Sequence, residues 1–264
     1  MDKNKDKYYG IMFGFILADA ISNKYNIHLE NRNKLANFEK TNYNISYHSH
    51  ILLILFKTLL KNSPIINYDK LCKKLYKWYI NDNYKSINST FAVAMNNYKT
   101  DFSYKEAKNG FTDYFGLIYL PIYIVFKADK YNLYKLTHSL PIFKLLTNVI
   151  FFFVNNNNKE IPEIFKDVID EPFVGSLDAF ESLRCAIKAF IHTNSFIEGL
   201  LLLIRSVEYV QPSCILYGII AGNYYGLTGI FNMDNPEYEF DIKNLKDYKK
   251  YLALIDKGWE SEII

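Results

Sequence analysis

The chain has 264 residues, half of them hydrophobic and 22% charged, which excludes a disordered protein and allows one large folded domain. Lys and Arg number 31 against 28 Asp and Glu, and this near balance excludes the overall basic excess of many nucleic-acid-binding proteins. The high numbers of Tyr (23) and Phe (20) are those that an AT-rich genome produces, so we do not read aromatic clusters as functional signals.

The first twenty residues, MDKNKDKYYGIMFGFILADA, superficially resemble a secretory signal peptide with an Ala-x-Ala cleavage site. However, Asp2 and Asp6 dilute the basic start, and Gly14 interrupts a short apolar run. A later stretch, CILYGIIAGNYYGLTGI, is uncharged for 17 residues but rich in Gly and only marginally long enough to span a membrane. We therefore expect a soluble protein, and a secreted or membrane-associated helical protein stays a weaker alternative.

Apolar residues recur at helical spacing in nearly every segment, and no segment shows the sustained alternation and hairpin turns of strands. In YDKLCKKLYKWYI, for example, Leu71, Leu75 and Trp78 lie on one helical stripe. The pattern predicts helices near 7–21, 51–61, 68–80, 103–128, 131–154, 176–192, 195–209, 213–226 and 244–256. No repeat or long linker interrupts the series, so we predict one all-α domain over residues 1–264.

Two of the predicted helices carry small residues four positions apart. These residues are Gly10, Gly14 and Ala18 in the first helix, and Gly218, Gly222 and Gly226 in the late one. Each Gly inside a helix costs about 1 kcal/mol relative to Ala. The two ridges therefore indicate a close approach of the backbone, either to another helix or to a ligand.

The turn NISYHSH, directly before the helix 51–61, carries His48 and His50. Two His two residues apart can chelate a metal from a loop, but on a helix they diverge by about 200°. The third ligand would come from His28, His138, His192 or a carboxylate, and the sequence does not place one. The simpler interpretation is a polar turn in which Ser46 or Ser49 acts as the N-cap of the helix.

Asp19 stands near the end of an otherwise apolar helix. An unpaired buried carboxylate is costly, so Asp19 should pair with backbone amides or a cation, or lie at a cleft. The three cysteines, Cys72, Cys185 and Cys214, are widely spaced and odd in number. They predict neither a disulfide framework nor a zinc knuckle, and a reducing, cytoplasmic compartment fits them best.

Taken in order, four segments resemble the ADP-ribosylglycohydrolase family. GIMFGFILADAIS is similar to the family's Gly-rich helix ending in G-D-A-x-G and keeps Asp19 and Ala20. The turn 46–49 falls where the family has T-D-D-T before an apolar helix, and Leu136-Thr137-His138 matches a mid-chain LTH. VEYVQPSCILYGIIAGNYYGLTGI is similar to the late family helix that begins with G-G-D-x-D-T.

This resemblance covers residues 8–230 and implies a compact helical bundle of the ADP-ribosylglycohydrolase type, with residues 231–264 as a C-terminal extension. It also implies a central cleft that binds an ADP-ribose-like ligand. Residues of this cleft, by the resemblance, are Asp19, Ser46, Tyr47, His48, Ser49, Tyr209 and Gln211.

The departures from the family concern its metal site. In the family, the paired Asp of T-D-D-T and the Asp and Thr of D-x-D-T bind two Mg²⁺ ions, which position the ribose and the attacking water. The four aspartate positions fall here on Tyr47, His48, Tyr209 and Gln211, and the threonine falls on Pro212. Mg²⁺ prefers carboxylate and water oxygens, and no nearby acidic run replaces the lost charges. We therefore expect neither the Mg²⁺ pair nor a catalytic residue that depends on it.

A glutamate implicated in catalysis in parts of the family falls on Asn26. Glu30 is nearby and could substitute only if the loop is rearranged. The leading interpretation is a degenerate, catalytically inactive protein of this fold that works by binding or as a structural or assembly component. One version keeps an ADP-ribose-like ligand in the cleft. The other binds a protein partner or a second copy of itself, with Tyr47, His48 and Tyr209 filling the cleft.

The alternative is an active ADP-ribosyl hydrolase, cleaving the N- or O-glycosidic bond of ADP-ribosylated protein, with an altered metal site. His48, His50 and Glu30 would then hold a softer metal such as Zn²⁺. Neither interpretation involves nucleic acid or a membrane.

Overall fold

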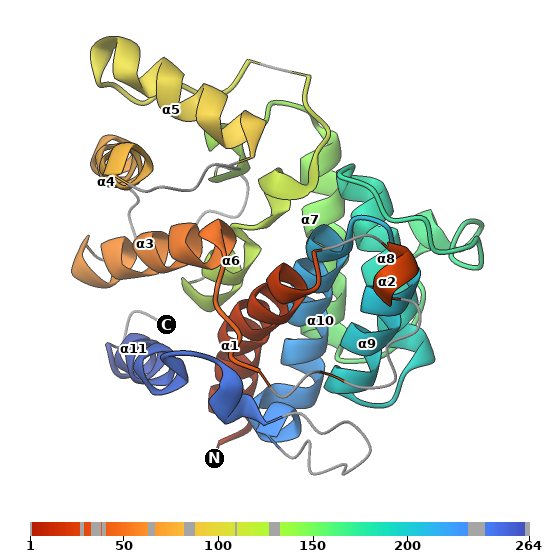
Figure 1. The fold of residues 1–264 in the computed structure, drawn as a ribbon. Helices are drawn as coiled ribbons and strands as arrows, with labels where there is room; N and C mark the ends of the chain where they lie inside the picture. Colours follow the sequence, from red (N-terminus) through yellow and green to blue (C-terminus); the bar gives the residue numbers. More distant parts are fainter. Residues whose placement is uncertain are drawn as a thin grey trace.

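The computed structural model describes residues 2–26, 29–32, 38, 41–62, 67–81, 88–108, 110–126, 133–231 and 241–261, and these residues are mostly helical (Figure 1). The described part contains no strand, only isolated bridges that join Tyr43 to Leu245 and Asp113 to Asp178. The α-helices are α1 (Lys3–Lys24), α2 (Leu29–Arg32), α3 (Tyr47–Asn62), α4 (Tyr68–Asn81), α5 (Ser89–Asp101), α6 (Leu120–Phe126), α7 (Ile142–Asn156), α8 (Ala179–His192), α9 (Phe196–Ser206), α10 (Val210–Phe231) and α11 (Tyr248–Glu260). Short 3₁₀ helices are η1 (Tyr114–Leu117), η2 (Leu133–Leu136), η3 (Glu163–Phe165) and η4 (Ile242–Asn244).

Helices α1 and α10 form the central pair, and their glycine ridges face each other. A Cβ atom built on Gly10 would lie 2.0 Å from the carbonyl oxygen of Gly222, and one on Gly14 would lie 2.4 Å from that of Gly218. Real Cβ atoms do not approach other atoms so closely, so only glycine permits this backbone distance. The predicted close approach is confirmed, and it is helix against helix.

The last glycine of the ridge ends this contact with a kink. Gly226 has φ 68°, in the left-handed region that favours glycine, and α10 continues beyond it in a new direction. The carboxylate of Asp6, from α1, accepts hydrogen bonds from the backbone N–H and the hydroxyl of Thr228, both at 2.8 Å. The Oδ1 atom of Asp6 thus accepts both hydrogen bonds from the turn that follows the kink in α10.

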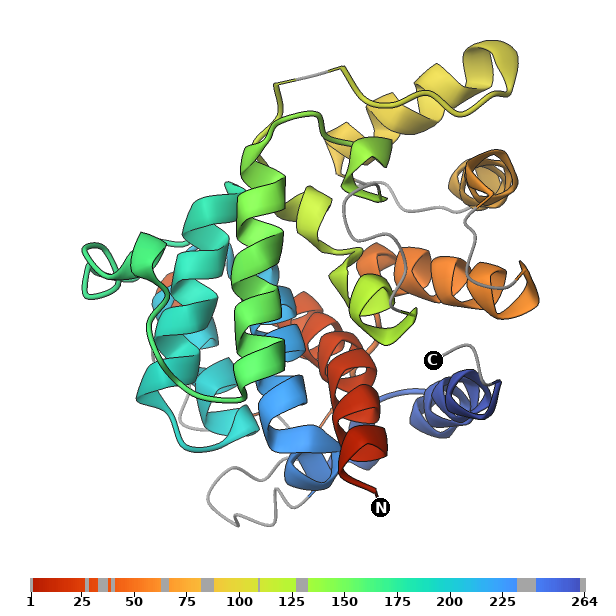
Figure 2. The ribbon, with the colours of Figure 1, turned by 180° about the vertical axis from the view of Figure 1, so that it is seen from behind.

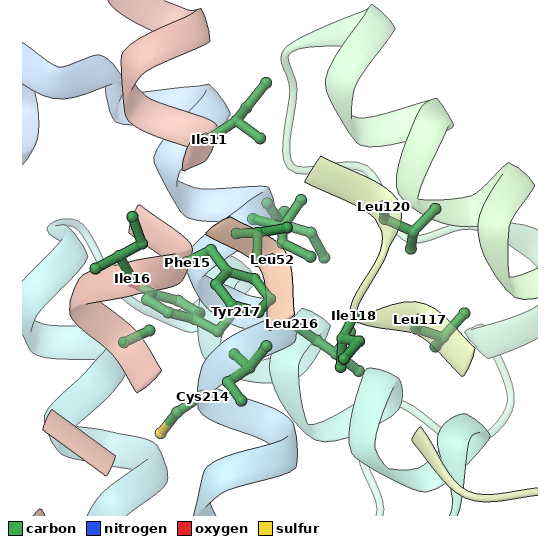
Figure 3. Close-up of a cluster of buried hydrophobic side chains, with 14 of the residues drawn as sticks. Ile11, Phe15, Ile16, Leu52, Leu117, Ile118, Leu120, Cys214, Leu216 and Tyr217 are labelled. Carbon is green, nitrogen blue, oxygen red and sulfur yellow. The ribbon is translucent and has the colours of Figure 1, made fainter. Parts of the chain in front are cut away.

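The other helices surround this pair (Figures 1 and 2). Helices α8 and α9 pack on α10, and α3, α6 and α11 pack on α1, while α4 and α5 extend from α3 to the side. Figure 3 shows the core where these layers meet, with Phe15 of α1, Leu52 of α3 and Tyr217 of α10 buried together. The buried aromatic and aliphatic residues form one continuous cluster.

Helix α10 is long and apolar enough, by length and composition, to cross a membrane. Most of it is buried against neighbouring helices, as expected of the core helix of a globular bundle. The cysteines Cys72, Cys185 and Cys214 are all buried and free.

Two predicted helices differ from the structure. The helix predicted over 103–128 is wrong in its first half: residues 104–108 and 110–113 form no helix, and only η1 and α6 follow. Helix α5, just before it, was not predicted, although Asn88 caps its first turn by accepting from the N–H groups of Thr90 and Phe91. The pattern near 131–154 is interrupted between η2 and α7, where Pro141 leaves no N–H for a continuous helix.

Candidate functional site

The carboxylate of Asp19 lies at the buried junction of α1, α3 and α10. Its Oδ2 atom accepts from the backbone N–H groups of Ser46 (2.9 Å) and Ser49 (3.3 Å), at the start of α3. Its Oδ1 atom accepts from the hydroxyl of Ser46 (2.5 Å) and the amide of Gln211 (3.0 Å). A helix N-terminus favours negative charge, so the turn before α3 provides a partner for this buried carboxylate.

His48 extends this network away from Asp19. Its Nδ1 atom lies 2.8 Å from the hydroxyl of Ser46 and 3.4 Å from Asp19 Oδ1, and its Nε2 atom lies 2.5 Å from the hydroxyl of Tyr114. The Ser46 hydroxyl therefore links Asp19 to one ring nitrogen of His48, and the Tyr114 hydroxyl is the partner of the other ring nitrogen. The ring of Tyr47 covers His48, with their centroids 3.9 Å apart.

Ser46 precedes α3, and its hydroxyl accepts from the N–H of His48 at 3.2 Å, which is the N-cap role expected of Ser46 or Ser49. Ser49 contributes its backbone N–H to Asp19 instead. Its hydroxyl is buried and forms no hydrogen bond within the described part of the chain.

Burial raises the pKa of Asp19, but hydrogen bonds and charge from His48, together with donors from Ser46 and Ser49, outweigh it and lower the pKa below its ordinary value. Asp19 is therefore an ionised carboxylate whose charge is balanced by dipoles and hydrogen bonds inside the protein. The whole network is buried: Asp19, His48 and Ser49 are 0% exposed.

The donor set does not fit the Mg²⁺ pair of the family. A carboxylate offers about four lone-pair positions, and four donors already occupy those of Asp19. Tyr47, His48 and Gln211 bring an aromatic ring, an imidazole and an amide to the positions where the family has carboxylates. No step of a metal-dependent hydrolysis can be assigned to these residues.

The zinc hypothesis fails on geometry. His48 points to Asp19 and Tyr114, whereas the His50 ring stacks on Trp78, with centroids 6.2 Å apart. Glu30, the proposed third ligand, is exposed on α2. Among the described residues, no three His, Cys, Asp or Glu side chains come together in a group that could hold a metal ion.

The other possible third ligands are placed as follows. His138 is buried beside Asp113, and His192 is exposed at the end of α8. His28 lies outside the described residues.

The structure therefore brings together Asp19, Ser46, Tyr47, His48, Ser49 and Gln211 of the expected cleft residues. Tyr209 does not fill the cleft: it lies in the bend before α10 and is 47% exposed. Asn26, at the position of the family's glutamate, is also exposed. The helix predicted over 195–209 included Tyr209, but α9 ends at Ser206 and Tyr209 lies between two helices.

A second acid–histidine pair, of buried His138 and partly buried Asp113, lies beside this network and was not predicted. Asp113 accepts from the hydroxyl of Thr90 and the N–H of Phe115, and lies 3.4 Å from His138 Nε2. Burial raises the pKa of Asp113, but hydrogen bonds from His138 and Thr90 lower it overall. His138 belongs to the LTH segment, but Asp113 falls where a helix was expected, so sequence patterns gave no reason to pair them.

Replacing Tyr114 by Phe should cost about 1–2 kcal/mol, because the buried Nε2 of His48 loses its partner. Urea denaturation of the two proteins measures this difference. Tyr98→Phe is the matched control, since Tyr98 is also buried and its hydroxyl forms no hydrogen bond with the described residues; it should be within about 0.5 kcal/mol of wild type. Equal losses in both variants would contradict the role of the Tyr114–His48 bond.

No family model matches the chain, and no curated protein matches its sequence. Among solved structures, the chain is similar to one described as "ADP-ribosylglycohydrolase-related protein complex", with a TM-score of 0.72 and 16% identity over 99% of both chains. The expected all-α fold of the ADP-ribosylglycohydrolase type is thereby confirmed. The similarity extends beyond residues 8–230 and includes α11.

Proposed function

We propose that this chain, which has the fold of an ADP-ribosylglycohydrolase-related protein, is a non-catalytic protein that works as a structural or assembly component. The observation that supports this proposal most directly is that the Asp19 carboxylate already accepts four hydrogen bonds from the protein. An acid whose lone pairs are all engaged inside the protein is available neither to a metal ion nor to a substrate hydroxyl.

The residues around Asp19 support the same conclusion. A two-metal hydrolase needs open carboxylates and room for a metal-organised water. Here the rings of Tyr47, His48 and Phe115 pack together, with Tyr47 and Phe115 centroids 6.3 Å apart and His48 and Phe115 centroids 5.9 Å apart. These contacts favour a stabilising role for the former site over a reactive one.

The burial of these side chains also favours assembly over retention of an ADP-ribose-like ligand. Ser46 and Gln211, which would contact a ligand in an open cleft, are 4% and 8% exposed and hydrogen-bond to Asp19. We place the protein in a reducing, cytoplasmic compartment, in keeping with its buried free cysteines. On this proposal it needs no metal cofactor.

A hydrolase assay tests the proposal. The purified chain is incubated with protein ADP-ribosylated on arginine or serine, with Mg²⁺ or Zn²⁺, beside an active ADP-ribosylglycohydrolase as positive control. We expect no release of ADP-ribose above the enzyme-free rate. Metal-dependent release that is lost in the Asp19→Asn variant would overturn the proposal and establish the altered hydrolase instead.

Calorimetry with ADP-ribose separates the two non-catalytic versions. We expect no binding heat, because the donors of the site are engaged with Asp19. Saturable binding that disappears in Gln211→Ala would support the ligand-binding version and contradict the assembly role of this scaffold.

A further inference from the structure

Charge is unevenly distributed over the fold, although the chain as a whole is nearly neutral. The described residues from 47 to 108, which form α3, α4 and α5, contain nine Lys and three Asp or Glu. Residues 142–231, which form α7 to α10, contain six Lys or Arg and nine Asp or Glu. The first segment therefore carries an excess of six positive charges, and the second an excess of three negative charges.

On the basic side, two adjoining hollows form a groove that we call the lysine groove. One, of about 550 Å³, lies between α3 and α4, and the other, of about 520 Å³, lies between α3, α4 and α11. They share Ile54, Lys57 and Trp78. Lysines that line the groove are Lys57, Lys61, Lys74, Lys77, Lys250 and Lys257.

The charge of the lysine groove is largely uncompensated. Asp247 is the one carboxylate among the lining residues. None of the six lysines forms an ion pair with a carboxylate in the described part of the chain; Lys74 donates to the hydroxyl of Thr58 instead. The floor is apolar, with Ile54, Leu53 and Trp78. Such a groove fits a segment that has exposed carboxylates and apolar side chains.

The acidic side of the same molecule presents a segment of this kind, which we call the acidic projection (residues 160–177). Its exposed carboxylates are Glu160, Glu163, Asp167, Asp170 and Glu171. Val174 and Leu177, at its end, are 58% and 49% exposed. Such exposure of large apolar side chains beside a charged rim is typical of contact surfaces.

The acidic projection is held in a fixed shape. Arg184, which is 1% exposed, donates to the carbonyl oxygens of Val168, Glu171 and Pro172 at 2.7–3.1 Å. Lys188 donates to those of Asp170 and Glu171. The carbonyl oxygens of the segment therefore face inward to these two cations. Because the segment is already ordered, it loses little conformational entropy on binding.

The two features cannot meet within one chain. In both Figure 1 and Figure 2, the segment between α7 and α8 projects on the side away from α3, α4 and α11. Their complementary charges can be used only between molecules. An interface between two different surfaces of identical chains is heterologous and continues from copy to copy unless it closes into a ring.

We propose that the lysine groove of one copy receives the acidic projection of a second copy, so that the chain assembles head to tail. This inference rests on the proposed assembly role and names its partner. A nucleic acid is the weaker occupant, because one face of Trp78 already lies on His50 and the groove contains no arginine to grip phosphates. In the proposed contact Val174 and Leu177 reach the apolar floor while the carboxylates meet the lysine rim.

A charge-swap experiment tests this pairing. The groove variant carries Lys57→Glu, Lys61→Glu and Lys77→Glu, and the projection variant carries Glu163→Lys, Asp167→Lys and Asp170→Lys. We expect wild type to associate with rising concentration and to dissociate in high salt, as measured by light scattering. Each variant alone should stay monomeric, and an equimolar mixture should associate again, because each reversed surface then faces an opposite charge.

The control variant reverses three lysines outside the groove, Lys99→Glu, Lys108→Glu and Lys243→Glu, and should associate like wild type. Circular dichroism establishes that each variant is folded. A wild type that stays monomeric at its solubility limit would overturn the inference, as would a mixture that fails to associate. Binding of a fluorescent dT oligonucleotide to monomeric wild type, lost in the groove variant, would overturn it and assign the groove to nucleic acid.

These results are independent of the hydrolase assay, because none of the substituted residues lies in the Asp19 network. If copies of the chain fail to associate and the chain shows no hydrolase activity, only this inference is contradicted. Metal-dependent hydrolysis by the chain would contradict the proposed function, whatever the association measurements gave.

Discussion

Replacing Gly222 by Ala should lower the free energy of unfolding by about 3 kcal/mol or more, although Ala favours a helix over Gly by about 1 kcal/mol. The new Cβ would lie 2.1 Å from the carbonyl oxygen of Gly10 and 2.8 Å from its carbonyl carbon. Both are backbone atoms of α1, so no side chain can rotate away and the two central helices must separate. We expect the melting temperature to fall by about 6–12 °C.

Gly110→Ala is the matched control, because a Cβ built there meets nothing within 4 Å. Its melting temperature should stay within about 2 °C of wild type, as for an ordinary surface change. Differential scanning calorimetry of the three proteins measures both effects. If Gly222→Ala melts at the wild-type temperature or above it, the α1–α10 contact is not as close as described.

Replacing Asp19 by Ala should cost about 3–5 kcal/mol at neutral pH. The change leaves two backbone N–H groups, a hydroxyl and the Gln211 amide without their acceptor in a buried site. Asp19→Asn keeps the shape of the side chain but not its charge, and should cost less than Ala but remain clearly destabilising. Asp167→Asn, on the exposed acidic projection, is the control and should change stability little.

The same carboxylate predicts a pH dependence. The pKa of Asp19 is lower in the folded chain than the ordinary aspartate value, so the folded protein releases this proton more readily than the unfolded one. The stability that Asp19 contributes is therefore complete above the unfolded pKa of about 3.9 and lost as the pH falls through the lower folded value. Urea denaturation between pH 7 and pH 2 should show a smaller acid loss in Asp19→Asn than in wild type, with the difference developing below about pH 4. Equal losses would show that other carboxylates cause the acid sensitivity.

Local patterns were sufficient for most helices that bury one face in the core, although α5 was missed. The periodic apolar residues predicted α3 and α4 closely, and the spacing of Gly10, Gly14, Gly218 and Gly222 predicted a close helix contact. Both features follow from the period of a single helix, because residues three or four positions apart lie on the same face. The predicted helix over 103–128 failed in its first half, where residues 104–108 and 110–113 form no helix and none of them is buried, so the apolar spacing there does not mark a buried helix face.

The candidate site shows the same division. By the resemblance, the sequence itself accounts for what is missing: Tyr47, His48, Tyr209 and Gln211 fall where the family has aspartate, and folding cannot supply those carboxylates. It also singled out Asp19 as a buried acid that needs partners. Which partners it finds depended on bringing α1, α3 and α10 to one point, because Gln211 is 192 residues from Asp19 along the chain.

The excess of lysine in residues 47–108 and the excess of acid in residues 142–231 can be read along the chain. Tyr114 and the Asp113–His138 pair, the exposure of Tyr209, and the placement of those two segments on different sides were decided only by the tertiary structure. Their physical cause is shared: hydrogen bonds and Coulomb interactions depend on distance in space, and the sequence specifies distance only along the chain. A chain with a net charge of only +3 thus folds into a molecule with a basic groove and an acidic projection on different sides.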